Sequence, residues 1–412
     1  MFRKLLTFDE AKKAIDRLEL AALGSEEILL LDAYNRVLAG DVVSALDIPP
    51  FDRSTVDGYA VKAEDTFGAE ENQPVHLKVC GTVSVGELPS VKVSKGEAAE
   101  IVTGAPIPEG ADSVVMVEDT EKQNGELHVF SAVTGNENVM RKGADIRKGE
   151  TVLKARQVLS SRETGVLAAL GMAKVKVFAV PKVAVLSTGA EVTEPGKKLV
   201  PGKIYDINAY SLSVAVVESG GKPAYLGVVS DDKARLRESL EHALACADLV
   251  ITSAGVSVGP KDIMPQTVDS LGKPGIVFSG VAVKPGKPTT FALIGKKPVF
   301  SLPGHPASAL LMFHLLVRPV IQRLSGRVPV EPACVEALAG ARMFSAKGRR
   351  TFVMVKLRRD RLNRLVAEPV ETGASGAITT LARADGYVEV PENQQFVDKD
   401  EEVCVALFRS GL

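Results

Sequence analysis

Lys182-Val-Ala-Val-Leu-Ser187 is the first of three short apolar runs that decide the fold of this chain. The other two are Asp248-Leu-Val-Ile-Thr-Ser253 and Pro298-Val-Phe-Ser-Leu302. Each run has the length of a buried strand, and the segments between the runs have apolar residues at helical spacing. Strands that are joined by helical crossovers form parallel sheets. We therefore predict that residues 181–326 form an α/β domain with a mostly parallel sheet.

Each apolar run ends in a loop that is rich in glycine and polar residues. The loops are Thr188-Gly-Ala-Glu191, then Ala254-Gly-Val-Ser-Val-Gly259 with Asp262 close behind, and Pro303-Gly-His-Pro306. Open α/β sheets bind their ligands outside the carboxyl ends of their strands. The three loops therefore predict the edge of the sheet at which the protein works.

Helix signals support this reading. Residues 208–219 have helical spacing and stop at Gly220, and a second helix is expected after Ser230, whose hydroxyl is the predicted cap. The apolar segment that begins at Pro306 is judged too short and too interrupted to span a membrane, which predicts a helix packed under the sheet.

The remaining chain divides into three further predicted domains. Residues 1–45 and 148–180 form a helical and linker domain, because capping boxes start at Thr7 and Ser160 and residues 32–39 have a helical pattern. Residues 46–147 contain short strands, with a hairpin turn at Asn124-Gly125, and form an inserted β domain. Residues 327–412 contain alternating runs typical of a small β-barrel.

Composition limits the classes of function. The chain of 412 residues has a formal net charge of −1, which gives no field that favours nucleic acid. Its four cysteines are scattered without a Cys-x-x-Cys pair, which fits a reducing compartment and argues against a zinc or iron–sulfur site. Asp9 and Glu10 interrupt any signal-peptide core. These features predict a soluble, cytoplasmic protein without a membrane partner.

The loops hold acidic and basic residues beside turns. The acidic and hydroxyl candidates are Asp57, Thr103, Asp145, Glu191, Asp231 and Asp262, and the basic ones include Lys284 and Lys287. Carboxylates that are gathered at one site repel each other unless a cation joins them, and Mg²⁺ bound with substrate phosphates would do so. Taken singly, an aspartate beside glycine is more often a turn residue, and the lysines read as a solvated turn. The pattern as a whole suits a phosphorylated or otherwise oxyanionic small molecule.

Seven ordered motifs together resemble one family. They are Ser54-Thr-Val-Asp-Gly-Tyr59, Thr103-Gly-Ala105, Ser187-Thr-Gly-Ala-Glu191, Gly255-Val-Ser-Val-Gly259 with Asp262, Lys284-Pro-Gly-Lys-Pro288, Leu302-Pro-Gly-His-Pro306 and Gly373-Ala-Ser-Gly376. In this order they resemble the molybdopterin molybdenumtransferases, the molybdenum insertases related to the C-terminal domain of gephyrin. The resemblance covers nearly the whole chain.

The resemblance implies a fold, a reaction and a set of site residues. It implies an elongated, L-shaped subunit of four domains in a homodimer, and the insertion of molybdate into adenylylated molybdopterin with release of AMP and use of Mg²⁺. It assigns catalysis to Asp57, Thr103, Asp145, Glu191, Asp231 and Asp262, with Glu191 and Asp262 as metal ligands. It places substrate or molybdate near Lys284, Lys287, Pro303, Pro306, Ser375, Gly255 and Ser257. Each site is expected to be shared between the two subunits.

The chain departs from the family pattern at four positions. Ala190 replaces a usual aspartate, Ala254 a glycine, His305 an asparagine, and Met140 a residue that is often basic. These changes bear on metal affinity and oxyanion selectivity. Insertion of tungstate, adenylyl transfer to molybdopterin, or a non-enzymatic scaffold role stay open as alternatives, and a molybdopterin adenylyltransferase is a candidate partner.

Overall fold

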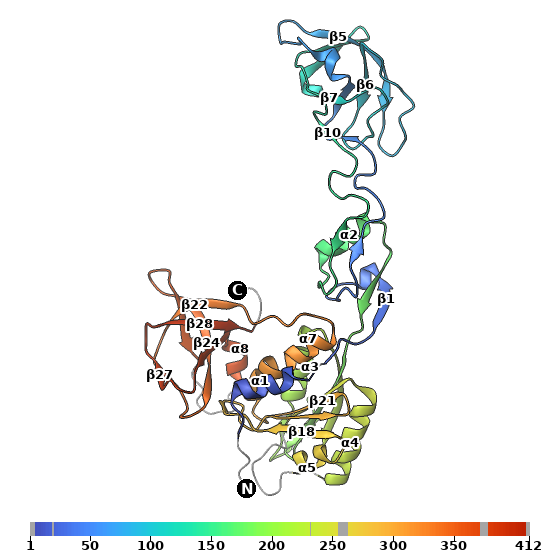
Figure 1. The fold of residues 1–412 in the computed structure, drawn as a ribbon. Helices are drawn as coiled ribbons and strands as arrows, with labels where there is room; N and C mark the ends of the chain where they lie inside the picture. Colours follow the sequence, from blue (N-terminus) through green and yellow to red (C-terminus); the bar gives the residue numbers. More distant parts are fainter. Residues whose placement is uncertain (1–4, 19, 231, 254–262, 371–377, 409–412) are drawn as a thin grey trace. The chain divides into compact units, whose positions relative to one another are not determined.

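The computed structural model describes residues 5–18, 20–230, 232–253, 263–370 and 378–408, and it forms two compact units (Figure 1). The larger unit holds residues 1–27, 35–39 and 176–412, and the smaller unit holds residues 28–34 and 40–175. The finer division into four domains stays a prediction.

A six-stranded sheet in the order β16-β13-β17-β21-β20-β18 forms the centre of the larger unit. Its strands are β13 (Lys182–Thr188), β16 (Lys222–Val229), β17 (Leu249–Ser253), β18 (Pro274–Ser279), β20 (Thr290–Ile294) and β21 (Lys297–Leu302). The pairings of β13 with β16, of β13 with β17, and of β17 with β21 are parallel. The pairings of β20 with β21 and of β18 with β20 are antiparallel. The three apolar runs are therefore neighbouring parallel strands, as predicted.

Helices cover both faces of this sheet. Successive side chains of a strand point to opposite faces, and the apolar side chains on each face pack against helices. Val183 and Val185 pack with α1 (Phe8–Asp16), α3 (Asn208–Glu218), α6 (Pro306–Met312) and α7 (Arg318–Leu324). Ala184 and Leu186 pack on the opposite face with α4 (Lys233–Cys246) and α5 (Met264–Asp269). Both faces are dry, which explains why the strands are almost continuously apolar.

Two of the predicted helix details were wrong. The cap of α4 is Asp232, whose carboxylate accepts hydrogen bonds from the backbone of Ala234 and Arg235, so Ser230 does not cap this helix. By length and composition alone, the segment Pro306–Leu324 could cross a membrane, so the prediction that it is too short was wrong, whereas the prediction of a helix packed on the sheet is confirmed. A π-helical turn, Phe313–Val317, links α6 and α7, and its buried Phe313 and Val317 belong to the protein core. The segment is thus a core helix that covers the sheet.

The C-terminal part of the larger unit is a closed β-barrel, in agreement with the prediction. Its strands are β22 (Cys334–Ala339), β24 (Arg350–Arg359), β25 (Leu365–Pro369), β26 (Gly386–Val390) and β28 (Glu402–Leu407), and β24 closes the ring by pairing with both β25 and β26. A disulfide joins Cys334 to Cys404, which are 70 residues apart in the sequence, and this differs from the prediction that the scattered cysteines suit a reducing compartment. Only the pairing of β22 with β28 brings these two cysteines together.

The smaller unit contains a second six-stranded sheet, in the order β7-β4-β6-β5-β9-β8. The strands are β4 (Gly58–Val61), β5 (Val75–Val83), β6 (Glu97–Ile101), β7 (Ser113–Met116), β8 (Thr120–Gln123) and β9 (Glu126–Val129). Asn124 and Gly125 both have positive φ and form the predicted hairpin turn between β8 and β9. The inserted β region therefore exists as expected.

Shorter elements complete the structure. They are the pairs β1 (Ser25–Leu29) with β12 (Lys174–Phe178), β2 (Val42–Val43) with β11 (Thr151–Leu153), β3 (Arg53–Ser54) with β10 (Val139–Met140), β14 (Val192–Thr193) with β15 (Ile204–Tyr205) and β23 (Met343–Phe344) with β27 (Phe396–Val397), the strand β19 (Val283–Lys284), the helices α2 (Ser161–Ala169) and α8 (Thr379–Arg383), and the 3-10 turns Leu30–Asp32, Ala63–Thr66 and Val117–Asp119. Both predicted capping boxes, at Thr7 and Ser160, are present.

The helix predicted over residues 32–39 was wrong. A 3-10 turn ends at Asp32, and Asn35 then adopts a positive φ of 61°, which does not continue a right-handed helix.

Candidate functional site

A cavity of about 1130 Å³ opens in the larger unit where the three parallel strands end. Ser187 and Thr188 end β13, Ser253 ends β17, and Pro303 follows β21, and all four residues line the cavity. Lys284, Lys287 and Pro306 line it as well, together with Glu191. The structure thus gathers the described candidates of the larger unit in one place, at the edge of the sheet that the sequence predicted.

Three residues that line this cavity each have a buried side-chain atom without a partner among the described residues. Ser187 Oγ, Thr188 Oγ1 and Asn208 Oδ1 have no hydrogen-bond partner among the described residues. The Asn208 amide is held in place, because its Nδ2 donates to Ser253 Oγ at 2.6 Å and to the Gly304 carbonyl at 2.8 Å. A buried polar atom without a partner costs about 1–3 kcal/mol, a cost that a bound polar ligand offsets. These atoms therefore mark a place where a ligand fits.

Glu191 lies at the rim of the cavity, against a glycine that leaves room for it. A Cβ at Gly189 would lie 2.7 Å from Glu191 Oε2, and Gly189 has a φ of +134°, so any side chain here would displace the carboxylate. Lys203 Nζ donates to the carbonyl oxygen of Ala190 and so joins this loop to the segment before α3. The Thr-Gly-Ala-Glu motif therefore holds an exposed carboxylate beside the cavity.

Among the described residues, cations outnumber carboxylates in the lining of the cavity. The lining includes Lys203, Lys284, Lys287 and Arg349, against the carboxylates of Glu191 and Asp206.

Asp206 is not available to these cations. It is buried and accepts hydrogen bonds from the Ala209 backbone and from the Tyr225 hydroxyl at 3.2 Å. Burial, and then the Asp206 carboxylate, raise the pKa of Tyr225 well above its ordinary value, so that Tyr225 stays a donor. The surplus of positive charge favours an oxyanionic ligand.

The loop 284–288 is held by close packing. A Cβ at Gly286 would lie 2.4 Å from Met312 Sδ, so only glycine allows this loop to lie on α6. The hydroxyl of Thr289 donates to the Gly286 carbonyl at 2.7 Å. Lys284 and Lys287 are thus carried on a rigid backbone that packs against Met312, the last residue of α6.

The smaller unit brings together two further candidates. Asp57 Oδ1 accepts hydrogen bonds from the Thr103 backbone N–H at 2.7 Å and from its hydroxyl at 2.8 Å. These two bonds hold the pKa of the Asp57 carboxyl below its ordinary value, the backbone bond contributing most. Gly58 is required next to Asp57, because a Cβ there would lie 1.9 Å from the Val115 carbonyl oxygen.

Asp145 is exposed in a separate turn of the smaller unit. Its backbone N–H donates to the Ile48 carbonyl at 3.0 Å, and no hydrogen bond joins it to Asp57 or Thr103 within the described structure. The candidates Asp231, Asp262, Gly255, Ser257 and Ser375 lie outside the described residues. The functional roles of all these residues stay predictions.

The sequence motifs did not include three of the polar residues that line the cavity. Asn208, Lys203 and Arg349 line the cavity but belong to none of the motifs. Asn208 is the first residue of α3, a position that the pattern marks only as a helix start.

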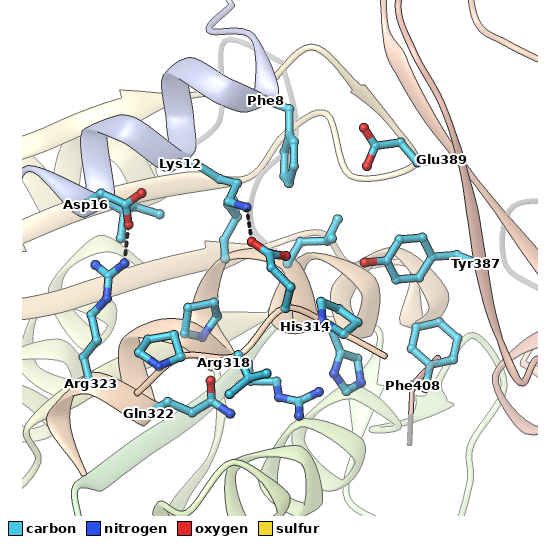
Figure 2. A pocket seen from close by; sticks show the side chains of 18 of the residues that line it. Phe8, Lys12, Asp16, His314, Arg318, Gln322, Arg323, Tyr387, Glu389 and Phe408 are labelled. Carbon is cyan, nitrogen blue, oxygen red and sulfur yellow. Dashed lines mark hydrogen bonds and ion pairs between the residues drawn. The ribbon is translucent and has the colours of Figure 1, made fainter. Parts of the chain in front are cut away.

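A second, smaller cavity of about 370 Å³ lies in the larger unit beside α1 and α7 (Figure 2). Its charged side chains include the ion pairs Lys12 with Glu331, at 3.2 Å, and Asp16 with Arg323. Burial, and then the charge of Arg318, lower the pKa of His314 to about 4, so this imidazole is neutral at neutral pH. None of the candidate residues lines this cavity, which makes it the weaker candidate.

Models of known families match almost the whole chain in three segments. The MoeA N-terminal region (domain I and II) matches residues 6–171, a probable molybdopterin binding domain matches residues 184–323, and the MoeA C-terminal region (domain IV) matches residues 336–408.

Several relatives are similar over nearly their full length. The chain is 36% identical to a molybdopterin molybdenumtransferase from Nostoc over 92% of this chain and 88% of the relative. It is 34% identical to a putative molybdopterin biosynthesis protein from Methanocaldococcus jannaschii, over 99% of this chain and 96% of the relative. A crystal structure of a molybdopterin biosynthesis MoeA protein from Pyrococcus horikoshii is similar with a TM-score of 0.87 and 43% identity, covering 99% of this chain and 100% of that one.

Proposed function

Because this chain belongs to the molybdopterin molybdenumtransferase family, we propose that it is the transferase that inserts molybdenum into molybdopterin during cofactor synthesis. Its substrates are proposed to be adenylylated molybdopterin and molybdate, and AMP leaves when molybdate reaches the dithiolene. The observation that carries this proposal is the cavity at the strand ends, whose described lining holds three buried polar atoms without partners and more cations than carboxylates.

The residues of the cavity suit the two halves of this substrate. A pterin ring presents both donors and acceptors, which the hydroxyls of Ser187 and Thr188 and the Asn208 carbonyl oxygen are free to meet. The cations Lys284, Lys287 and Arg349 suit the negative charge of phosphates and molybdate. Binding and orientation by such groups supply much of the rate of a reaction that needs no protein nucleophile.

We propose Glu191 as one ligand of a Mg²⁺ ion. The donors fit this metal, because Mg²⁺ is commonly bound by one or two carboxylates together with substrate phosphates and water. Glu191 is exposed, lines the cavity, and has its carboxylate next to Gly189. When bound, Mg²⁺ neutralises charge on the phosphates and so favours the departure of AMP. Asp262, the second proposed ligand, lies outside the described residues.

The proposal is tested with purified protein, adenylylated molybdopterin and molybdate. We expect AMP release that depends on molybdate, together with a pterin that carries molybdenum by mass spectrometry. Parallel assays with tungstate measure the preference for the metal oxyanion. If the protein instead consumes ATP with molybdopterin alone, adenylyl transfer is its reaction and the proposal fails.

We also propose that the chain acts as a homodimer, as its family resemblance implies, and in the cytoplasm, as its composition and N-terminal sequence predict. A molybdopterin adenylyltransferase is proposed as the supplier of its substrate. Light scattering of the purified protein tests the dimer. Mixing inactive Asp57→Asn and Glu191→Gln subunits tests whether the sites are shared, because random pairing then restores roughly a quarter of the activity.

A further inference from the structure

Two histidines face each other across neighbouring strands of the smaller unit. His76 on β5 and His128 on β9 are directly opposite in the antiparallel register, so that both side chains leave the sheet on the same face. Their ring centroids are 4.3 Å apart and the ring planes are inclined by 61°. Figure 1 labels β5 and its neighbour β6 in this sheet.

A glutamate completes a group of three side chains. Glu126 stands two residues before His128 on β9 and therefore points to the same face of the sheet. Its Oε2 lies 3.7 Å from His76 Nδ1. One potential ligand atom from each of the three side chains lies within 4.8 Å of the other two. The geometry thus places two imidazole nitrogens and one carboxylate oxygen around a common point.

The group is accessible and its surroundings are acidic on one side. The side chains of His76 and Glu126 are 54% and 66% exposed, so a metal ion reaches them without any movement of the backbone. Glu121 on the edge strand β8 is directly opposite His128 and extends the same row. Lys78 is directly opposite Glu126 in the register of β5 and β9 and places a cation next to this carboxylate.

The three side chains match the donor preference of divalent transition metals, of which Zn²⁺ is the redox-inert one. Two imidazoles and one carboxylate are a ligand set of Zn²⁺, with a fourth position left for water. Mg²⁺ and Ca²⁺ prefer oxygen ligands alone and are poorly served by this set. The sequence argument against a zinc site rested on the scattered cysteines, and it does not apply to this group, which contains no cysteine.

We propose that His76, Glu126 and His128 bind a Zn²⁺ ion that bridges β5 and β9. The ion joins two strands that are 50 residues apart in the sequence, His76 to Glu126, and so stabilises the folded sheet of the smaller unit. The site belongs to the smaller unit, whereas the cavity of the proposed transferase reaction belongs to the larger one. Its existence does not depend on that reaction.

Equilibrium dialysis of tag-free, EDTA-treated protein against Zn²⁺ in excess Mg²⁺ tests the site. Mg²⁺ occupies oxygen-only sites such as that proposed at Glu191, and the substitution Cys246→Ser in every sample removes the exposed thiol. We expect this protein to bind Zn²⁺ and the additional substitutions His76→Gln or His128→Gln to weaken binding at least about tenfold. Glu126→Gln is expected to weaken it less, because both imidazoles remain.

His242→Gln is the matched control, because His242 is exposed on α4 and lies outside the group. It is expected to leave Zn²⁺ binding unchanged. In thermal unfolding, Zn²⁺ is expected to raise the Tm of the parent protein and not that of His76→Gln. Absence of Zn²⁺ binding in the parent protein, or equal binding after His76→Gln and His128→Gln, overturns the proposal. Circular dichroism checks that both variants are folded.

Discussion

The polar groups of the cavity in the larger unit and those of the Asp57–Thr103 pair in the smaller unit differ in whether they have hydrogen-bond partners. In the cavity, Thr188 Oγ1 and Asn208 Oδ1 are buried and lack partners among the described residues. In the smaller unit, the exposed Asp57 carboxylate already accepts two hydrogen bonds from Thr103. Buried polar groups without partners lower the stability of the folded protein, and a ligand that bonds to them removes this cost. Paired polar groups stabilise the fold and keep a fixed orientation.

The largest expected effect concerns the carboxylate at the cavity rim. Glu191→Gln, or removal of divalent metal with EDTA, is expected to lower the rate of AMP release by about a hundredfold or more. The reason is that a metal ion stabilises the charge of the transition state by several kcal/mol in such reactions. The single-turnover rate measures this loss.

Glu194→Gln is the control for Glu191→Gln, because Glu194 forms an ion pair with Lys197 and does not line the cavity. It is expected to keep the rate of the unmodified protein. Full activity in EDTA would show that the carboxylate serves the loop and not a metal.

The second effect concerns the cations of the cavity. Lys284→Ala is expected to raise the molybdate concentration that half-saturates insertion by about tenfold, since a hydrogen bond to a charged group contributes about 1.5–3 kcal/mol. Binding of adenylylated molybdopterin, measured by fluorescence, is expected to change less. Lys296→Ala, in the exposed turn after β20, is the control. Equal weakening of both ligands would assign Lys284 to the phosphates instead of molybdate.

The third effect tests the comparison itself. Thr188→Val keeps the shape of the side chain and removes a buried hydroxyl that has no partner, so the free energy of unfolding is expected to stay the same or to rise by about 1 kcal/mol. Substrate binding is expected to weaken severalfold. Thr103→Val removes a hydroxyl that is paired with Asp57, and it is expected to lower stability instead. Urea unfolding measures both changes, and a loss of stability in Thr188→Val would contradict the ligand role of this hydroxyl.

The smallest effect is the dependence of the smaller unit on pH. The pKa of Asp57 is lowered in the folded protein, so its carboxylate contributes stability that is present above the unfolded pKa of about 3.9 and is lost as the pH falls through the folded pKa. Thr103→Val removes one of the two donors, and we expect the pKa of Asp57 to rise toward its ordinary value. NMR titration of the carboxyl carbon measures this rise. An unchanged pKa would mean that the backbone bond alone sets it.

Local sequence patterns were sufficient for much of the fold. The apolar runs at 182, 248 and 298 became neighbouring parallel strands, and the capping boxes at Thr7 and Ser160 began helices. Asn124-Gly125 became the hairpin turn. Each of these signals depends on residues that are close together in the chain, so the element that it forms can be predicted without the rest of the molecule.

Errors appeared where two local signals competed. Ser230 and Asp232 are both good caps, and the carboxylate of Asp232 was the one whose position allowed bonds to two backbone N–H groups. Residues 32–39 have helical spacing, but Asn35 turns the chain out of the helical region.

The sequence by itself therefore determined the strands, the motifs that follow them, and the edge of the sheet at which the candidate residues gather. Only the tertiary structure decided which distant side chains meet. Asn208 joins Ser253 and Gly304, Cys334 joins Cys404, and His76 faces His128, in each case because the packing of α3 or the register of a strand pair brings them together. Such contacts depend on the alignment of elements that lie tens of residues apart, and no local pattern encodes that alignment.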